Sequence, residues 1–389
     1  MKLTVLQENL YPALRTALKA ISSRPPLPIL NSFLLKAEKK EISIAATDLY
    51  LGMTALIAGV VEQTGRALVP AKLFTESVRS LPVGKLELEL NDNTLHVSHP
   101  AGKIKIQCQP SAEFPEFPSP DGQQFQLEPQ LVKDIDHYVS FSVSQDLTRQ
   151  VLTTLLFKPT KQGLQVVGTD GFRLSVLTLA DTALRFEDGQ SVLVPARAFN
   201  EISSILKISH SGDKTNSPQD ESSQATAGDE LVRLVVSDQL KHIFFMVPNL
   251  EVSARIVEGQ YPPYNKIIPK SFELETTLEV AELVDQVSRA LVFARRSSNI
   301  VTWQFSDDEL KISAQADGQG VFDGRVPLGS KVKAPVKIAF NGRYLHDLLA
   351  RLNSDTVWFG MNDSLKPVMF KEPGNSNFQH VIMPFRLND

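Results

Sequence analysis

The sequence has few of the features that mark secreted, membrane-spanning or disulfide-stabilised proteins. It contains 1 cysteine among 389 residues, which excludes an intrachain disulfide and any zinc site that needs several cysteines. No apolar run approaches the roughly 20 residues of a membrane span. The polar pair Gln7-Glu8 interrupts the start of the chain too early for a signal peptide. We therefore expect a cytoplasmic protein with no membrane partner.

The chain also lacks a large excess of positive or negative charge. Lys and Arg total 40 against 44 Asp and Glu, so the formal net charge is −4. This balance argues against a generic basic nucleic-acid binder, but it leaves open how charge is divided between faces. With 42% hydrophobic and 22% charged residues, the chain has the composition of a globular protein.

Motifs for catalysis, metals and cofactors are weak. His96 and His99 would face opposite sides of a strand, and no third metal ligand is evident. The glycines of Gly318–Gly324 lack dinucleotide-binding spacing. Cys108 has no histidine partner that the sequence can place, so we interpret it as an inert thiol. We therefore expect no catalytic residues, no metal and no cofactor, and a protein that is not an enzyme.

Internal similarity is the most informative feature of the chain. The segment LVPAKLF at Leu68–Phe74 recurs as LVPARAF at Leu193–Phe199, and a weaker third copy lies at Ile338–Leu345. In each copy an apolar strand leads into an amphipathic helix. Pro70 and Pro195 are predicted to occupy the first helical turn, where a missing N–H costs nothing.

Two further triplets support the repeat. Thr47–Leu49, Thr169–Gly171 and Ala316–Gly318 each follow alternating apolar residues, a pattern typical of a strand that ends in a turn. An amphipathic helix is predicted near the start of each copy. The sequence therefore predicts three copies of one α+β unit, each with two helices and several strands.

The predicted domain boundaries follow from these repeats. We expect domain 1 at 1–121, domain 2 at 122–255 and domain 3 at 256–389. The aromatic-proline stretches Phe114–Pro120 and Tyr261–Tyr264 mark the joints. Their separation exceeds that of the strand–helix copies by about 22 residues, which predicts a mobile, polar and acidic insertion at about 209–230 in domain 2.

Several ordered motifs on this threefold repeat resemble one family, the bacterial DNA sliding clamps, which are the β subunits of DNA polymerase III. The motifs are Arg24–Leu30, Ala46–Leu49, Val69–Ala71, Thr169–Leu174, Tyr261–Tyr264 and Val381–Leu387. The resemblance implies a head-to-tail homodimer that closes into a six-domain ring, with helices inside and antiparallel sheets outside. It also implies that double-stranded DNA threads the ring without sequence preference and that the clamp holds the replicative polymerase on DNA, conferring processivity. The implied partners are a clamp loader, and DNA polymerases and repair proteins that bind through a short Gln/Leu/Phe motif.

Basic residues on the helical segments suit such a ring, because diffuse charge attracts phosphates without trapping the protein on one sequence. By resemblance, Arg24, Lys72, Gln150 and Arg197 are expected near DNA. The helical pattern adds Arg15, Lys19, Arg79 and Lys207. For any one of these residues, an ordinary solvated helix face is an equally good interpretation.

The resemblance also implies an apolar pocket for the partner peptide. Its expected residues are Leu152, Thr169, Gly171, Phe172, Arg173, Leu174, Pro262, Lys266, Ile267, Asn341, Tyr344, Leu365, Val381, Ile382, Met383, Pro384, Phe385 and Arg386. Some of the apolar strand residues could instead be plain core.

The sequence departs from the family pattern at a few of these positions. Phe172 stands where a histidine is common, Lys266 where an arginine is expected and Pro367 where a small polar residue is expected. Because lysine offers only a point charge, we expect a looser contact at 266. Asn388 and Asp389 extend the chain beside the pocket.

Ring closure requires an interface between domain 1 of one protomer and domain 3 of the other. By resemblance, Ile104 and Ile106 on an edge strand are expected to meet Val292 and Phe293 at a helix end. Two other classes remain open. One is an enzyme with a polar active site between repeated units, and the other is a monomeric three-lobed scaffold that binds peptides without encircling DNA.

Overall fold

The fold is described from a computed structural model. It describes residues 1–386 apart from Ala101, Asp181, Ala183, Arg185, 187–189, 211–230, 238–240, Ser330, Lys331 and Lys333. Most of the predicted insertion and the Asn388-Asp389 extension lie outside the described residues. The chain forms two compact units. Unit 1 comprises Met1–Pro129 and Glu201–Ile256, and unit 2 comprises Gln130–Asn200 and Val257–Asp389.

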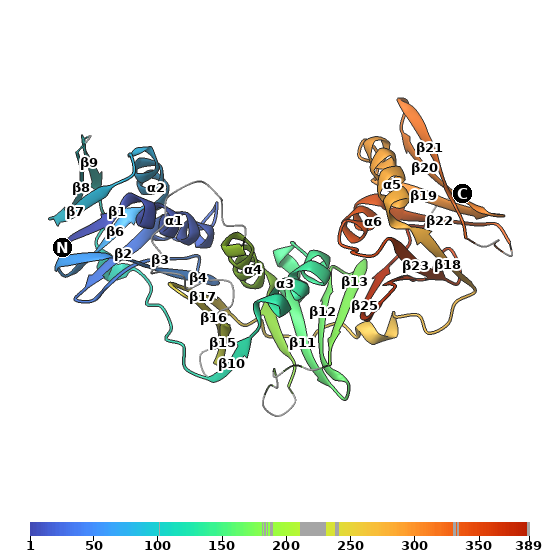
Figure 1. The fold of residues 1–389 in the computed structure, drawn as a ribbon, viewed down its shortest axis with the longest axis horizontal. Helices are drawn as coiled ribbons and strands as arrows, with labels where there is room; N and C mark the ends of the chain where they lie inside the picture. Colours follow the sequence, from blue (N-terminus) through green and yellow to red (C-terminus); the bar gives the residue numbers. More distant parts are fainter. Residues whose placement is uncertain are drawn as a thin grey trace, which may run out of the picture. The chain divides into compact units, whose positions relative to one another are not determined.

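Unit 1 contains two antiparallel sheets (Figure 1). The first has the order β5-β1-β7-β8-β9 and the second the order β10-β15-β16-β17-β4-β3-β2-β6. The strands of the first sheet are β1 (Lys2–Leu6), β5 (Gly59–Gln63), β7 (Lys85–Asn91), β8 (Thr94–His99) and β9 (Gly102–Gln107). Those of the second are β2 (Ser32–Glu38), β3 (Glu41–Thr47), β4 (Leu51–Ile57), β6 (Gly65–Pro70), β10 (Gln123–Leu127), β15 (Val232–Ser237), β16 (His242–Val247) and β17 (Leu250–Arg255).

Unit 2 also contains two antiparallel sheets. The larger has the order β14-β11-β12-β13-β25-β24-β23-β18 and the smaller the order β21-β20-β19-β22. The strands of the larger sheet are β11 (Thr154–Thr160), β12 (Gly163–Thr169), β13 (Arg173–Leu179), β14 (Val192–Pro195), β18 (Leu274–Glu279), β23 (Thr356–Met361), β24 (Val368–Glu372) and β25 (Asn375–Ile382). Those of the smaller are β19 (Ile300–Ser306), β20 (Glu309–Ala316), β21 (Gly320–Pro327) and β22 (Val336–Asn341).

Each sequence copy supplies two α-helices. They are α1 (Gln7–Ala17) and α2 (Ala71–Ser80), α3 (Pro129–Tyr138) and α4 (Ala196–His210), and α5 (Val280–Ala294) and α6 (Gly342–Leu349). Their apolar stripes are buried, as in α5, where Leu283, Val287 and Leu291 face the smaller sheet of unit 2. The prediction of two helices and antiparallel strands in each of three copies is therefore confirmed.

The two prolines of the repeat are placed differently from the prediction. Pro70 ends β6 and Pro195 ends β14, so neither lies in the first helical turn. Pro70 is the N-cap residue of α2 and has an extended ψ of 114°. Here the missing proline N–H ends a strand ladder just before the helix begins.

The compact units do not follow the repeats. Strand β17 pairs with β4 of the first repeat, whereas β13 pairs with β25 of the third. Strands of the second repeat therefore belong to a sheet in each unit. The boundaries near 121 and 255 stay predictions, because the sheets run across them.

Candidate functional site

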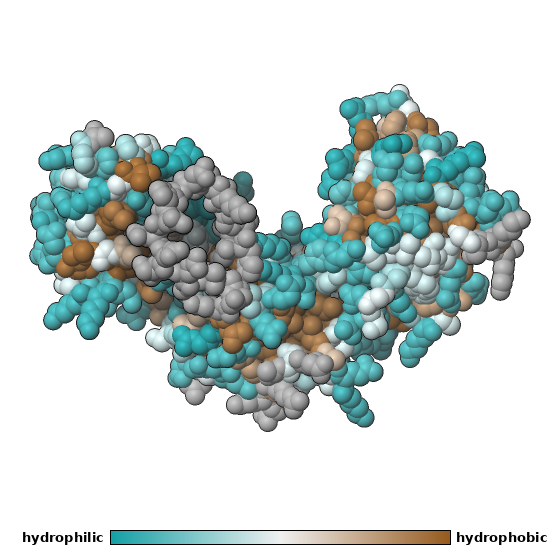
Figure 2. All heavy atoms as spheres, viewed as in Figure 1, coloured by the Kyte–Doolittle hydropathy of each residue, from teal (hydrophilic) through white to brown (hydrophobic). Residues whose placement is uncertain are grey.

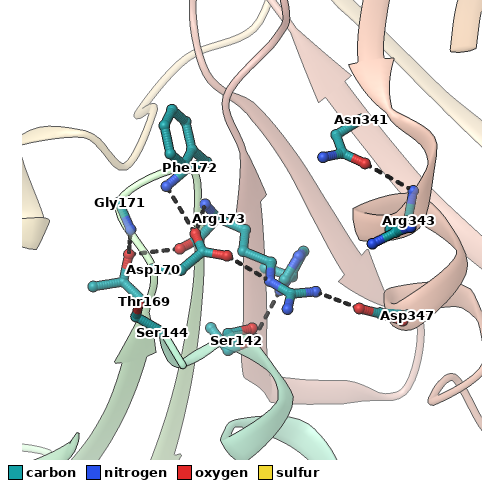
Figure 3. A network of polar contacts seen from close by, with 12 residues as sticks. Ser142, Ser144, Thr169, Asp170, Gly171, Phe172, Arg173, Asn341, Arg343 and Asp347 are labelled. Carbon is teal, nitrogen blue, oxygen red and sulfur yellow. Dashed lines mark hydrogen bonds and ion pairs between the residues drawn. The ribbon is translucent and has the colours of Figure 1, made fainter. Parts of the chain in front are cut away.

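A tight turn between β12 and β13 is the centre of the predicted pocket (Figure 3). The Thr169 hydroxyl donates to the carbonyl of Arg173 and accepts from the amide of Gly171. The Asp170 carboxylate accepts from the amides of Phe172 and Arg173, at 2.8 and 3.0 Å. Gly171 has a φ of 93°, which glycine adopts without a steric penalty. The sequence Thr-Asp-Gly thus satisfies its own backbone and leaves the side chain of Phe172 exposed.

The guanidinium of Arg173 links this turn to α6 (Figure 3). Its Nε donates to Asp170 at 3.1 Å, and a second nitrogen donates to Asp347 at 2.7 Å. The Arg173 side chain is only 10% exposed and also lies over the ring of Tyr344, 4.6 Å from its centroid. Burial, followed by the nearby charge of Asp170, raises the pKa of the Tyr344 hydroxyl. Arg173 is therefore held in one orientation by two carboxylates and a ring.

A buried apolar cluster lies beneath the turn. It joins Leu174 on β13 to Val381 and Met369 on β25 and β24, with Tyr264 from the linker that follows the second repeat. Leu174 and Val381 are paired directly across the two strands. Leu174 is fully buried and Val381 is 2% exposed, so both belong to the core beneath the turn. Leu152 and Ile382 are likewise buried.

Large apolar side chains remain exposed in the same unit. They are Phe172, Ile267, Leu365 and Phe385, at 59%, 37%, 55% and 47% exposure. The backbone connects two of their segments, because the amide of Met383 donates to the carbonyl of Phe172 at 2.8 Å. Figure 2 shows one gathering of apolar side chains in unit 2, where Figure 1 draws β12. Exposed apolar side chains above a closed core are typical of a docking surface.

The other predicted pocket residues are polar or half-buried. Asn341 caps α6 by accepting from the amide of Arg343 at 3.0 Å. Lys266 ends a 3₁₀ turn at Tyr264–Lys266 and is exposed. Met383 and Pro384 are half-buried, while Pro262 and Arg386 are exposed. The amide of Phe385 donates to Ala339 on β22, so the end of the chain is tied to the smaller sheet.

Sequence reasoning missed two polar side chains of the candidate site. Asp170 lies inside the quoted Thr-Asp-Gly motif, and its role as an acceptor for two amides was a visible signal. Asp347 was not predictable, since its contact with Arg173 depends on where α6 lies against the turn.

The residues predicted to approach DNA are mostly exposed. Arg15 lies on α1, Lys72 and Arg79 on α2, and Arg197 and Lys207 on α4, all exposed. Arg24 lies in a loop and Gln150 in a 3₁₀ segment, and both are exposed. Arg351, another basic helix-end residue, is half-buried, with its guanidinium over Phe141 at 4.5 Å.

Lys19 differs from these residues. Its Nζ lies 2.7 Å from the Glu201 carboxylate and 3.5 Å from the Ser204 hydroxyl, both on α4. Because its charge is partly neutralised within unit 1, Lys19 offers less attraction to a phosphate than exposed Lys72. Sequence spacing could not reveal this pair, since Glu201 is distant in sequence.

The residues predicted at the protomer interface lie on one sheet edge, β9, and at the end of helix α5. Strand β9 ends one sheet of unit 1, and β21 ends the smaller sheet of unit 2. Ile104 is half-exposed, whereas Ile106 is 1% exposed and belongs to the core of its own chain. Val292 is 63% exposed, and Phe293 stacks on Phe322 of β21 with centroids 6.2 Å apart.

The described residues hold neither a candidate metal site nor a candidate membrane-spanning helix. No group of three or more His, Cys, Asp or Glu among them could hold a metal ion. None of the described helices is both long and apolar enough to span a membrane.

Three copies of a two-helix domain, joined by antiparallel sheets that continue from repeat to repeat, define the class of DNA clamps. Family models match at residues 1–118, 126–214 and 265–386, as the N-terminal, central and C-terminal domains of the DNA polymerase III beta subunit. The chain belongs to this family.

The sequences of individual relatives align with this chain along its whole length. A beta sliding clamp from Synechocystis is 29% identical over 409 residues, and one from Staphylococcus aureus is 24% identical over 400 residues. These alignments cover 100% and 99% of both chains. Among solved structures, sliding clamps from Bartonella birtlesii and Bacillus subtilis superpose with TM-scores of 0.88 and 0.86, at 24% and 22% identity and full coverage of both chains. These structural likenesses establish the fold.

Proposed function

We propose that this protein is a sliding clamp. Two copies close head to tail into a ring around duplex DNA, and the ring tethers the replicative polymerase and other replication and repair proteins. The protein acts by binding and topology, and it catalyses no reaction. The observation that carries the proposal is the threefold repeat of the clamp domain along the entire chain, matched in order by the three domain models of the family.

The sheet edges support the head-to-tail arrangement. Strand β9 of the first repeat and β21 of the third each stand at the end of a sheet. Pairing β9 of one protomer with β21 of the other would continue the antiparallel sheet and cover both edges. Half-exposed Ile104 and exposed Val292 supply apolar area for this interface. Ile106 contributes through its strand backbone, because its side chain is already buried.

The exposed basic residues support DNA binding without sequence preference. Arg15, Lys72, Arg79 and Arg197 are long, flexible cations on helices. Such groups attract phosphates through ion-dependent contacts that carry no sequence information. A ring needs only this weak attraction, since topology keeps it on the DNA.

The turn at Thr169–Arg173 and the exposed apolar residues around it support peptide binding in unit 2. A Gln/Leu/Phe peptide could bury two or three anchors, each worth about 1.5–3 kcal/mol. Much of this energy offsets the entropy of binding, so the expected affinity is modest and partners can exchange.

Oligomeric mass separates the ring from a monomeric peptide-binding scaffold. We expect sedimentation equilibrium to give twice the 43.1 kDa of one chain. A mass equal to one chain at micromolar concentration would contradict the ring.

Peptide titration tests the pocket. Replacing half-buried Met383 by alanine should weaken binding of a Gln-Leu-x-Leu-Phe peptide about tenfold, because one apolar contact is lost. Val83→Ala, at an exposed position between α2 and β7 of unit 1, is the matched control and should bind the peptide normally. Unchanged affinity in Met383→Ala would refute the assignment of the pocket.

A further inference from the structure

A buried polar chain lies directly behind the proposed peptide pocket, and the function described above does not use it. The hydroxyls of Ser142 and Ser175 are 2.7 Å apart, and Ser175 Oγ lies 2.8 Å from Nδ1 of His380. All three residues are fully buried. The site has no access for a substrate, so this serine–histidine contact is structural.

The position of the chain follows from the register of the strands. Leu174 pairs with Val381, and the next pair along the same two strands is Ser175 with His380. Successive residues of a strand point to opposite faces of a sheet. Leu174 and Val381 belong to the apolar cluster beneath the proposed pocket, so Ser175 and His380 occupy the reverse face of the sheet. There they meet Ser142 of the 3₁₀ turn at Ser140–Ser142.

The imidazole of His380 has one hydrogen bond and an apolar surrounding. Its ring stacks on Phe141 with centroids 5.3 Å apart, and its Nε2 has no hydrogen-bond partner among the described residues. A neutral ring with its proton on Nδ1 donates to Ser175 and leaves only a lone pair unpaired. A protonated ring would bury a second N–H without an acceptor, which is far more costly.

Among the charged groups near this layer, Arg173 on β13 opposes protonation of His380. Its carboxylate partners Asp170 and Asp347 offset part of that positive charge. The other ionisable groups on the elements packed nearby are Arg351 after α6 and Asp136, His137, Tyr138 and Glu372. Arg173 and Arg351 both lie over the Phe141 ring, at 5.4 and 4.5 Å. Burial, followed by the Arg173 charge, holds the pKa of His380 well below its usual value.

We propose that Ser142, Ser175 and His380 form a latch that fastens β25 to β13 behind the peptide pocket, and that neutral His380 is the positioning residue for the Val381–Met383 side of that pocket. The inference rests on the proposed peptide-binding function. Protonation of His380 requires the latch to open, and opening separates Val381 from Leu174.

The sign of the pH effect follows from proton linkage. While the latch is closed, His380 stays neutral, whereas an exposed imidazole titrates near pH 6.5. The open state therefore binds more protons below that pH, and acid favours opening. When the pH falls from 7.5 to 5.5, the equilibrium constant for opening of the latch between β13 and β25 should rise about tenfold because of this one group.

Hydrogen exchange of the full-length protein measures this opening. After correction for intrinsic rates, amides on β25 up to Ile382 should show the tenfold rise in the native protein and no such rise in His380→Phe. This variant keeps a planar ring but cannot titrate. Amides on β3 and β4 of unit 1, which have no histidine, provide the internal control. Equal pH ratios in the native protein and His380→Phe would overturn the latch.

A second variant keeps the test valid if His380→Phe fails to fold. Ser175→Ala keeps the imidazole and removes its hydrogen bond, so opening should rise at both pH values while the tenfold ratio persists. It should also weaken the Gln-Leu-x-Leu-Phe peptide several-fold at pH 7.5, whereas Ser253→Ala, a buried serine on β17 of unit 1, should not. Equal peptide affinity in both serine variants would overturn the positioning role. Absence of peptide binding to the native protein at pH 7.5 would instead refute the peptide site itself.

Discussion

The first and second repeats build the same turn with the same threonine and aspartate but with different neighbouring side chains. Thr47 and Asp48 of unit 1 make the hydrogen bonds that Thr169 and Asp170 make in unit 2. At the position of Gly171, however, the first repeat has Leu49, with a φ of 77°. The threonine and aspartate therefore specify the backbone of the turn, and the residues beside them are free to differ.

What differs is the surrounding of each turn. Arg173 has two carboxylate partners, whereas its counterpart Leu51 is apolar and buried. The next residue is Leu174 in unit 2 and Gly52 in unit 1, where the ring of Phe117 occupies the space. The same turn is thus tied to α6 by an ion pair and flanked by exposed apolar side chains in unit 2, whereas in unit 1 it borders a small pocket lined by Gly52, Phe117 and His242. Three substitution pairs test this comparison.

The largest expected effect lies at Leu174 and its counterpart Gly52. Leu174→Ala should lower the free energy of unfolding by about 2–5 kcal/mol, because it leaves a cavity in a closed core. Gly52→Ala should also destabilise, by about 1–3 kcal/mol. Its Cβ would lie 2.5 Å from Ser253 Oγ and 3.0 Å from the Phe117 ring. Urea denaturation of both variants measures the change. Tolerance of alanine at Gly52 would show that Ser253 and the Phe117 ring do not pack tightly against the first turn.

A smaller and more selective effect is expected at the two aspartates. Asp170→Ala and Asp48→Ala each remove the acceptor of two backbone amides and should each cost about 1–3 kcal/mol of stability. Only Asp170→Ala should weaken the Gln-Leu-x-Leu-Phe peptide, by about tenfold, since only Asp170 also holds Arg173. Equal peptide affinities in the two variants would mean that the Asp170–Arg173 pair plays no part in docking.

The smallest effect concerns the left-handed residue of each turn. Gly171→Ala should destabilise by about 1 kcal/mol, because a Cβ is strained at a φ of 93° although space around it is open. Leu49→Gly should change stability by less than this, since relief of strain offsets the lost burial of a half-exposed leucine. Differential scanning calorimetry can rank the two. A larger loss in Leu49→Gly would indicate that Leu49 packs more tightly than its exposure suggests.

Much of the fold could be predicted from the sequence because local rules and the threefold repeat agree. The Thr-Asp turns, the strands before them and the helices of Leu68–Phe74 and Leu193–Phe199 follow from turn chemistry and apolar spacing. The proline positions were wrong because an N-cap and a first helical residue have nearly the same sequence signal. Family resemblance supplied the pocket residues. The structure places Leu174 and Val381 in the buried apolar cluster beneath the turn, and their part in a pocket stays a prediction.

The remainder depended on contacts between distant segments. Asp347 reaches Arg173 only because α6 lies beside the turn, and Glu201 neutralises Lys19 only because α4 lies beside the end of α1. Nothing in the sequence around His380 indicates that its side chain is buried. Its burial against Ser175 and Phe141 follows from the register of β25 on β13, which the sequence pattern alone does not determine.

Retention on DNA of different topology tests the account most directly. Protein loaded by a clamp loader onto a nicked circular duplex should remain bound through gel filtration at moderate salt, and it should be released when a restriction enzyme linearises the circle. Release on cutting identifies a ring that holds DNA by enclosing it. Equal retention on circular and linear DNA would contradict encirclement and favour direct binding to the duplex surface.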